Sequence, residues 1–183
     1  MRRVVVVGNA GSGKTYLAST LASRFDLVNV ELDGLNWVPG QFNQRRPPEE
    51  AIAAVKSASL ENRWVIEGVY GWLAAVALPR AENLIWLDIP EEECIANLLG
   101  RPIKSGEDEG SRQALVAWCR EYRDRRNSSS YVAHRRLFEQ FPSRKDLLRS
   151  RAEINDFLAA NSNVDGKLPL GQLSPDPSTP PRS

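Results

Sequence analysis

The chain has 183 residues, with 24 Lys or Arg against 23 Asp or Glu and a formal net charge of +1. This length predicts a single domain that buries a core without disulfides or a structural metal, and the near-neutral charge disfavours a histone-like nucleic-acid binder. No run of eighteen apolar residues is present, which excludes a transmembrane helix, and Val4–Val7 is too short for an export signal. Cys94 and Cys119 form no CxxC pair and are interpreted as buried free thiols, so we expect a reducing, cytoplasmic location.

Short apolar runs alternate with amphipathic stretches along the chain, a pattern typical of a parallel sheet covered by helices on both faces. Four runs predict buried strands and a fifth is weaker; they span residues 3–7, 27–32, 64–66, 84–89 and 146–149. Helices are predicted between and after these strands, around 17–25, from Pro47, after Pro90, around 115–122, around 131–138, and from the Ser-x-x-Glu capping box at Ser150. Residues 101–110 are expected to form a mobile loop. Residues 161–183 hold five prolines among serines and glycines, which predicts a disordered tail.

The strongest functional signal follows the first predicted strand. Residues 8–15 satisfy G-x-x-x-x-G-K-[ST] and precede an amphipathic helix; they are Gly8, Asn9, Ala10, Gly11, Ser12, Gly13, Lys14 and Thr15. In such a loop the backbone N–H groups and the helix N-terminus bind polyphosphate oxygens, and the lysine adds positive charge near the β and γ phosphates. The threonine hydroxyl is suited to magnesium. We therefore predict a nucleoside-triphosphate site at residues 8–15, together with the adjoining Tyr16.

The loop alone does not choose among GTPases, AAA+ motors and small-molecule kinases. A GTPase would need a guanine-binding Asn/Thr-Lys-x-Asp, and none of the lysines lies in that sequence. An AAA+ motor would usually need a longer chain and an apolar run that ends in Asp-Glu, and neither is present.

Two further carboxylates follow predicted strands. Glu67 ends the strand Trp64-Val65-Ile66 and is the candidate to complete a magnesium site with Thr15. Asp33 follows Val30-Glu31-Leu32, and strand ends of an open parallel sheet surround the ligand crevice, so Asp33 is a candidate base or anchor for an acceptor.

Three segments together resemble a known family: residues 8–15, Leu32-Asp33-Gly34-Leu35-Asn36-Trp37-Val38-Pro39-Gly40, and Trp64-Val65-Ile66-Glu67-Gly68-Val69-Tyr70. They resemble the adenylate-kinase-like P-loop proteins labelled "DNA topology modulation protein", which are similar in plan to nucleoside monophosphate kinases and shikimate kinase. The resemblance runs from about Arg3 to Leu158. It implies ATP as the nucleotide, an acceptor-binding segment at about 33–60 and a lid that begins near Arg101.

The match is not complete at the third segment. Glu67-Gly68-Val69-Tyr70 stands where those relatives usually have Asp-Gly-Asn-Tyr, and the arginine that grips an acceptor phosphate in nucleoside monophosphate kinases has no counterpart here. The resemblance therefore leaves the acceptor open. Glu67, Gly68 and Tyr70 are candidate substrate contacts, and Trp37 and Tyr70 either stack on a ring or belong to the core.

Residues 120–151 contain ten Arg or Lys against four Asp or Glu. In a phosphoryl transferase, Arg123 and Arg126 would close with Arg101 over the transferring group and neutralise its charge. The alternatives are a solvated helix face or a DNA-contacting surface. The lone His134 is expected to have a structural or surface role, since one histidine cannot form a multi-histidine metal site.

These observations predict an α/β, three-layer P-loop domain over residues 1–160, with a five-stranded parallel sheet like that of nucleoside monophosphate kinases. The expected activity is magnesium-dependent transfer of the γ-phosphoryl group of ATP to a small-molecule acceptor that is a nucleotide, nucleoside or hydroxylated metabolite. Lys14, Asp33, Arg101, Arg123 and Arg126 are the candidate catalytic residues. The alternative is a nucleic-acid-associated ATPase that affects DNA topology.

Overall fold

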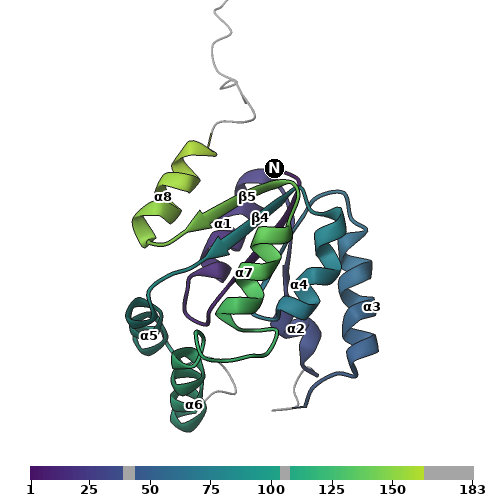
Figure 1. Ribbon diagram of the computed structural model, residues 1–183. Coiled ribbons are helices and arrows are strands. Elements are labelled where there is room, and N and C mark those ends of the chain that lie inside the picture. The colour runs from purple at the N-terminus through teal and green to yellow at the C-terminus, as the bar shows by residue number, and fades with distance from the viewer. Residues whose placement is uncertain (39–43, 104–107, 163–183) are drawn as a thin grey trace, which may run out of the picture.

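A five-stranded parallel sheet forms the centre of the molecule (Figure 1). The computed structural model describes residues 1–38, 44–103 and 108–162. The strands lie in the order β2-β3-β1-β4-β5 and span Val28–Glu31, Trp64–Gly68, Arg3–Gly8, Asn83–Leu87 and Arg144–Leu148. All four neighbouring pairs are parallel, so their carboxyl ends meet at one edge of the sheet. The predicted fold class, an α/β P-loop fold with five parallel strands, is confirmed.

Helices connect and cover these strands. Within the described residues the α-helices are α1 (Lys14–Phe25), α2 (Leu32–Asn36), α3 (Pro48–Ser59), α4 (Gly71–Ala77), α5 (Glu91–Gly100), α6 (Glu109–Arg120), α7 (Tyr131–Gln140) and α8 (Arg151–Ala160), and a short 3-10 helix η1 spans Leu78–Arg80. None of these helices is long and apolar enough to cross a membrane. The expected tail, 161–183, lies outside the described residues from 163 onward.

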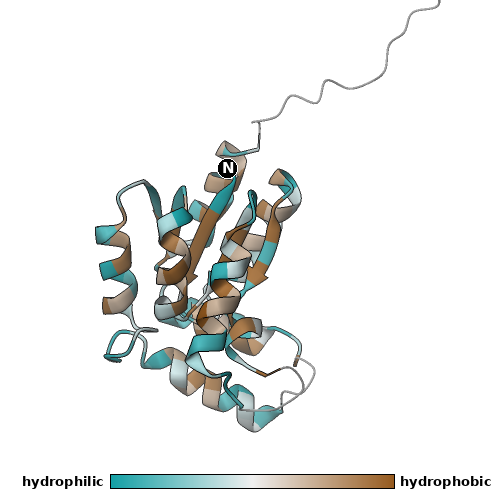
Figure 2. Cartoon of the chain, turned by 90° about the vertical axis from the view of Figure 1, so that its right-hand side faces the viewer, coloured by the Kyte–Doolittle hydropathy of each residue, from teal (hydrophilic) through white to brown (hydrophobic). Residues whose placement is uncertain are grey.

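The core consists of two apolar layers, one on each face of the sheet. Alternate residues of β1 point to opposite faces, so that Val4 and Val6 pack with α1, α5, α6 and α8. Val5 and Val7 pack on the other face with α3, α4 and α7. Figure 2 shows the same arrangement, with hydrophobic strands between helices whose outer faces are hydrophilic. The three-layer prediction is therefore confirmed.

The capping box predicted at Ser150 is present. The Ser150 hydroxyl accepts a hydrogen bond from the Glu153 backbone N–H at 3.1 Å, and the Glu153 carboxylate accepts one from the Arg149 N–H at 2.7 Å. The Ser150 bond satisfies an orphan donor of α8, because the first turn of a helix has no intrahelical acceptors for its N–H groups. The Glu153 carboxylate binds the N–H of Arg149, the residue before the cap, where a standard capping box would use the N–H of Ser150. Both bonds fix the β5–α8 connection at the edge where the strands end.

Several element boundaries differ from the prediction. The predicted buried strand at 27–32 is an edge strand, and Val28 is 52% exposed because only β3 pairs with it. The fifth strand begins two residues earlier than predicted, and Tyr122 lies beyond the end of α6 rather than on its inner stripe. The short helices α2 and α4 were not predicted, since five and seven residues carry too little periodicity to show a helical face.

Candidate functional site

The loop between β1 and α1 adopts a conformation that depends on its glycines. Gly11 and Gly13 have φ angles of 75° and 92°, in the left-handed region that disfavours other residues. A Cβ at Gly11 would lie 2.2 Å from the Cys94 carbonyl oxygen, so only glycine lets the loop pass over α5. The loop runs directly into α1, whose free N–H groups and dipole favour an anion there.

Lys14 and Asn9 fix the two ends of this loop. Lys14 Nζ donates to the Asn9 carbonyl oxygen at 2.7 Å, and the lysine is 8% exposed. The buried Asn9 side chain donates to the Cys119 carbonyl oxygen at 2.9 Å, and its own Oδ1 accepts from the Ala10 N–H. The positive charge is therefore held inside the loop, on the residue expected to bind the β and γ phosphates.

Thr15 and Glu67 meet as the sequence predicts for a magnesium pair. The Thr15 hydroxyl donates to Glu67 Oε1 at 2.7 Å, although 52 residues separate them in the chain. Parallel pairing of β1 with β3 causes this meeting, because Val7 lies opposite Gly68. Glu67 is 4% exposed; burial raises its pKa, while the charge of Lys14 and the Thr15 hydrogen bond act in the opposite direction. A cation near Glu67 would relieve this cost of burial.

A cavity of about 920 Å³ opens at the carboxyl edge of the sheet and contains most of the predicted site. Its phosphate end is lined by Ala10, Gly11, Gly13, Lys14, Thr15, Tyr16 and Glu67. The other predicted loop residues, Gly8, Asn9 and Ser12, are buried and are not among the described residues that line it. The cavity continues without interruption to a second end, which we call the acceptor end.

The acceptor end contains Asp33, Trp37 and Tyr70, as predicted, and the buried amide of Asn36. The Trp37 indole Nε1 donates to the Tyr70 hydroxyl at 2.9 Å. Burial and the negative charge of Asp33 raise the pKa of Tyr70 to about 12, so its hydroxyl keeps its proton at neutral pH. Asp33 lies in the first turn of α2 rather than in an extended strand end, and its side chain is exposed.

Gly68 has a packing role at this edge. A Cβ at Gly68 would lie 2.6 Å from the Leu32 Cβ, so the glycine lets β3 approach the start of α2. It is buried and is not among the described residues that line the cavity. The predicted substrate contact of Gly68 stays a prediction, and we expect any effect of this residue on a substrate to be indirect, through the position of α2.

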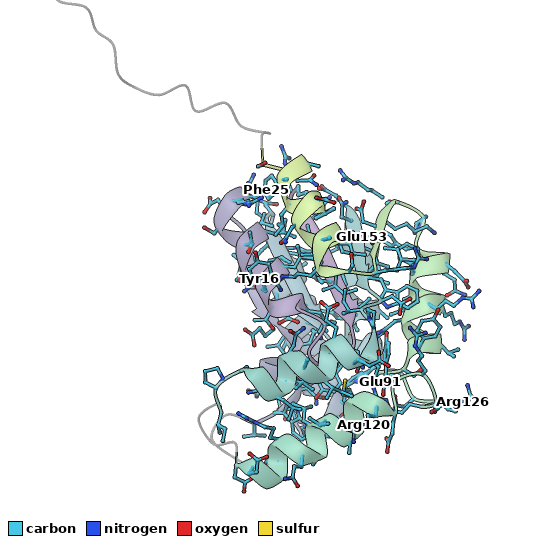
Figure 3. All side chains as sticks on the ribbon, turned by 90° about the vertical axis from the view of Figure 1, so that its left-hand side faces the viewer. Tyr16, Phe25, Glu91, Arg120, Arg126 and Glu153 are labelled. Atoms are coloured by element: carbon cyan, nitrogen blue, oxygen red, sulfur yellow. The ribbon has the colours of Figure 1, made fainter. Side chains whose placement is uncertain are left out.

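The structure separates the three arginines that the sequence groups as a lid. Arg101 lines the cavity at the end of α5. Arg123 lies outside it, where its guanidinium is 3.0 Å from Asp88 and 4.4 Å from the centre of the Tyr131 ring. Arg126 is exposed and also outside the cavity; in Figure 3 it lies at the outer margin of the molecule, far from Tyr16.

α5 and α6 form an antiparallel pair beside the cavity. Figure 3 shows Glu91, at the start of α5, and Arg120, at the end of α6, at the same end of this pair. The two helices contact each other. Trp118 of α6 and Arg101, the residue that follows α5, both line the cavity. Residues 104–107 of the predicted lid lie outside the described residues.

Sequence analysis missed several residues that line the cavity. Arg45 and Arg46 line the acceptor end, and Arg151 lines the phosphate end with its guanidinium 4.2 Å from the Tyr16 ring. An adjacent arginine pair inside the predicted acceptor-binding segment was an available signal for the first two. Arg151 gave no such signal, because in the sequence it is one residue of a capping box.

His134 has the structural role that the sequence predicts, in a buried position. Both ring nitrogens form hydrogen bonds. Nδ1 lies 2.7 Å from the Tyr122 hydroxyl, and Nε2 lies 2.9 Å from the Val69 carbonyl oxygen. Burial lowers its pKa to about 3, so the ring is neutral. Since the Val69 carbonyl can only accept, Nε2 carries the proton and the Tyr122 hydroxyl donates to Nδ1. The histidine thus connects the segment after α6 to the β3–α4 connection, which lines the acceptor end.

The predicted free, buried cysteines are also confirmed.

The chain matches a known protein family. A family model described as "AAA domain" matches residues 4–117, from β1 into α6. The chain belongs to this AAA-domain family. The match includes the P-loop and Glu67, but β3 of this family member ends in Glu67-Gly68 rather than in the Asp-Glu pair expected for an AAA+ motor.

The similarity of this AAA-domain chain to several known proteins covers nearly all of the chain. The uncharacterized protein YqaC of Bacillus subtilis (strain 168) is 23% identical over 183 residues, covering 91% of this chain and 96% of that protein. Two solved structures that cover 87% of this chain are a sugar kinase from Janibacter sp. HTCC2649 (TM-score 0.53, 18% identity, 93% of that chain) and a shikimate kinase from Acinetobacter baumannii in complex with shikimate (0.54, 14%, 90%). A shikimate kinase from Bacteroides thetaiotaomicron is similar at TM-score 0.54 and 14% identity, over 87% of this chain and 95% of its own. At these identities the likeness shows the fold, and it confirms the predicted resemblance to P-loop proteins of the nucleoside-monophosphate-kinase type.

Proposed function

We propose that the protein transfers the γ-phosphoryl group of ATP to a small-molecule acceptor in a magnesium-dependent reaction. One observation carries this proposal: a single cavity joins the P-loop, with Lys14 and the Thr15–Glu67 pair, to the Asp33 carboxylate. A nucleotide-binding site alone would need no second end with a carboxylate and an aromatic wall. The fold shared with a sugar kinase and two shikimate kinases supports the same class of reaction.

The roles of the residues follow from their positions. The loop N–H groups and Lys14 bind the phosphates, with Lys14 exchanging the Asn9 carbonyl for phosphate oxygens. Asp33 accepts or orients the proton of the acceptor hydroxyl, whose oxygen attacks the γ-phosphorus as ADP leaves. Arg101, on the cavity wall, is positioned to neutralise the charge that spreads over the transferring group. Arg123 and Arg126 would need a rearrangement of the α6–α7 segment to do so.

Thr15 and Glu67 fit a hard divalent cation. A buried carboxylate with a raised pKa and a hydroxyl 2.7 Å away offer two oxygen ligands, and magnesium commonly takes its others from phosphates and water. Among residues 1–38, 44–103 and 108–162 no three Asp, Glu, His or Cys side chains gather into an independent metal site. When bound, magnesium would neutralise charge on the β and γ phosphates.

The basic segment 120–151 supports a small-molecule transferase over a DNA-associated ATPase. Three of its arginines form ion pairs within the chain, Arg123 with Asp88, Arg135 with Glu139 and Arg144 with Asp146. Arg125 is buried with its guanidinium 3.5 Å from the Trp118 ring centre. Four of the ten Arg or Lys of this segment, Arg123, Arg125, Arg135 and Arg144, therefore already have partners within the chain.

Phosphorus NMR of the protein with Mg-ATP and a panel of nucleosides, nucleoside monophosphates and hydroxylated metabolites tests this proposal. We expect a new phosphorylated product that forms with ADP and requires magnesium. Lys14→Ala should lower the rate by about a thousandfold, since it removes the charge that binds the transferring phosphates. Arg136→Gln is the matched control, because Arg136 is exposed on α7 and outside the cavity. A Lys14→Ala variant with full nucleotide affinity and turnover would show that the site is elsewhere.

A further inference from the structure

Two cysteines lie under the P-loop, one on each helix of the α5–α6 pair. Cys94 lies one turn into α5, and Cys119 is the second-to-last residue of α6. In Figure 3 Glu91 and Arg120 mark the same end of this antiparallel pair, and the two cysteines are close to these residues in the chain. Both thiols are free and buried in one apolar cluster. The sequence has two cysteines, so a single disulfide is possible within the chain.

Residues 9–11 of the P-loop contact both cysteines. The Asn9 amide donates to Cys119 Sγ at 3.1 Å and to the Cys119 carbonyl oxygen at 2.9 Å. Cys119 Sγ also lies 3.5 Å from the Ala10 carbonyl oxygen. On the other helix, the Cys94 carbonyl oxygen is so close to Gly11 that a Cβ there would lie 2.2 Å from it. Because such packed atoms leave no free space, a shift of either cysteine would displace the loop.

The two thiols interact with each other, and their surroundings differ. The hydrogen bond between them lowers the pKa of Cys119 and raises the pKa of Cys94. The Asn9 amide and the positive charge of Arg125 act on Cys119 in the same direction as this bond, whereas burial and the charge of Glu91 oppose them. The thiolate is the nucleophilic form of cysteine. Cys119 is therefore the more reactive member of the pair, and Cys94 is a second thiol within its reach.

The positive charge beside Cys119 is held in place by the fold. The buried guanidinium of Arg125 donates to the Trp118 carbonyl oxygen and, at 2.9 Å, to the Ser129 carbonyl oxygen. It also packs 3.5 Å from the centre of the Trp118 ring. These partners are neutral, and Cys119 is among the groups whose negative charge the guanidinium stabilises. A fixed cation next to a thiol is an arrangement typical of reactive cysteines.

A thin wall separates the thiols from the cavity. Ala10, Leu98 and Leu115 line the cavity and also belong to, or pack against, the cluster that contains both cysteines. At Ala10 the wall is one residue thick, since its carbonyl oxygen contacts Cys119. Such a wall excludes bulky reagents but needs only a small opening to admit a molecule of the size of hydrogen peroxide. A nucleotide bound at the P-loop would cover this part of the wall.

We propose that Cys94 and Cys119 form a modification site, a dithiol that hydrogen peroxide oxidises to a disulfide, and that this disulfide weakens nucleotide binding at the P-loop. The proposal goes beyond the proposed function, since it needs no acceptor and no phosphoryl transfer. A disulfide bond is about 2.05 Å long, so its formation pulls the start of α5 toward the end of α6. Gly11 then loses its fit over α5, and Asn9 loses the thiol that accepts from its amide.

The oxidation is balanced by the peroxide alone. The Cys119 thiolate attacks one peroxide oxygen, the O–O bond breaks, and hydroxide leaves and takes up the proton that the thiol gave, forming water. The sulfur of Cys94 then attacks the sulfenic acid on Cys119, the S–O bond breaks, and the second water leaves with the proton of Cys94. The two thiols lose two electrons in total, and the peroxide is reduced to two water molecules.

Intact-mass spectrometry of the reduced protein after treatment with hydrogen peroxide tests the modification. We expect a product two hydrogen atoms lighter than the reduced chain, without a thiol that reacts with a maleimide after denaturation. Proteolytic digestion should give one peptide pair, joined through Cys94 and Cys119, and dithiothreitol should restore both thiols. Mg-ATP added before the peroxide should slow the oxidation, because the nucleotide covers the loop.

Titration with magnesium and a fluorescent ATP analogue measures the effect on the P-loop. The oxidised protein should bind the analogue about tenfold more weakly than the reduced protein, and dithiothreitol should restore the affinity. Coupling between two sites is reciprocal. Saturating nucleotide should therefore shift the equilibrium with reduced and oxidised glutathione toward the dithiol by the same factor.

Variants assign the effect to the two thiols. Cys94→Ser should stop at the sulfenic acid of Cys119, which dimedone traps, whereas Cys119→Ser should react slowly with peroxide. Peroxide should leave the nucleotide affinity of the double serine variant unchanged, which controls for oxidation of the single methionine in the sequence. Cys94→Ala and Cys119→Ala avoid a hydroxyl group in the core, and circular dichroism with thermal denaturation establishes that each variant is folded.

Three outcomes would overturn the proposal: a peroxide-treated chain that keeps both thiols or carries only sulfinic acid, a disulfide that joins two chains, or an internal disulfide that leaves nucleotide affinity unchanged. The proposed function fails separately. A redox-dependent nucleotide affinity without phosphoryl transfer would leave this site standing and remove the kinase activity. Phosphoryl transfer by a protein whose nucleotide affinity does not respond to peroxide would do the reverse.

Discussion

The two ends of the cavity are built in different ways. The phosphate end comes mainly from one stretch of chain, the P-loop and the start of α1, with Glu67 added by β3 and Arg151 by α8. The acceptor end is assembled from α2, the residues before α3, the β3–α4 connection and the segment before α7. A site formed by one stretch of chain can be recognised as a sequence motif, whereas a site assembled from distant segments by the fold cannot. The same division implies that nucleotide binding and acceptor binding can be disrupted separately.

The largest effect that separates the two ends is expected for Asp33→Asn. Loss of the carboxylate should lower kcat by about a hundredfold, since a positioned general base contributes at least that much. The affinity for Mg-ATP should change by less than about twofold, because Asp33 lies outside the P-loop and its charge is the smallest of the named influences on the pKa of Glu67. Steady-state kinetics with direct nucleotide titration checks both. A fall in nucleotide affinity as large as the fall in kcat would mean that the two ends are not independent.

A smaller effect is expected on stability, through the contact between His134 and the acceptor end. The pKa of His134 is lowered to about 3 by burial, against an ordinary value of 6.5. Above pH 6.5 both folded and unfolded chains hold a neutral ring. As the pH falls below 6.5, the unfolded chain binds a proton that the folded chain refuses until about pH 3, so stability is lost in this window. The loss should be about 2 kcal/mol between pH 6.5 and pH 5.

Denaturant unfolding of the wild type and of His134→Gln at these two pH values measures this effect. His134 is the only histidine in the sequence, so no other imidazole contributes. We expect the difference between pH 6.5 and pH 5 to shrink by about 2 kcal/mol in the variant, whatever its stability at neutral pH. An identical pH dependence in both proteins would mean that folding leaves the pKa of His134 near its ordinary value.

The smallest effect on the reaction is expected for Glu67→Gln, at the phosphate end. Turnover should fall by about tenfold or more and need more magnesium, because a neutral amide is a weaker ligand than a carboxylate. The stability of the folded variant should not fall with its turnover. The raised pKa of Glu67 means that its charge costs stability above its unfolded pKa, so removing the charge should leave the melting temperature equal or higher at pH 7.

Turnover as a function of magnesium concentration and thermal denaturation at pH 7 check the two parts of this prediction. Glutamine keeps an acceptor for the Thr15 hydroxyl, so the change isolates the charge. An unchanged magnesium dependence would assign Glu67 a structural role. A clearly lower melting temperature would mean that its charge stabilises the fold.

The sequence predicted the parts of the molecule that depend on local order. The P-loop, the five strands and the capping box at Ser150 all rest on residues close together in the chain, and each is present. The Thr15–Glu67 pair was also predicted, because the expected parallel sheet brings strand ends to one edge. The short helix α2 was missed, and with it the position of Asp33 in a first helical turn.

The arginines show why the rest could not be predicted. Arg45 and Arg123 are the same residue type, and the sequence favoured Arg123 because it follows the expected lid. Its partner Asp88 is 35 residues away, so the ion pair that holds Arg123 outside the cavity depends on how β4 and the segment after α6 meet. The exposure of Val28 has a similar origin, since strand order decides which strand lies at the edge. Long-range contacts of this kind have no local signal.

The fate of the γ-phosphate in a single turnover distinguishes transfer to a small acceptor from hydrolysis of ATP. Protein in excess over ATP labelled at the γ-phosphate is mixed with magnesium and a desalted small-molecule extract, and labelled products are separated and quantified. We expect the label to move to an organic phosphate ester in equal amount with ADP, and we expect Lys14→Ala to abolish the transfer. Label found only as inorganic phosphate, above all if duplex DNA accelerates its release, would contradict phosphoryl transfer to a small acceptor and favour a nucleic-acid-associated ATPase.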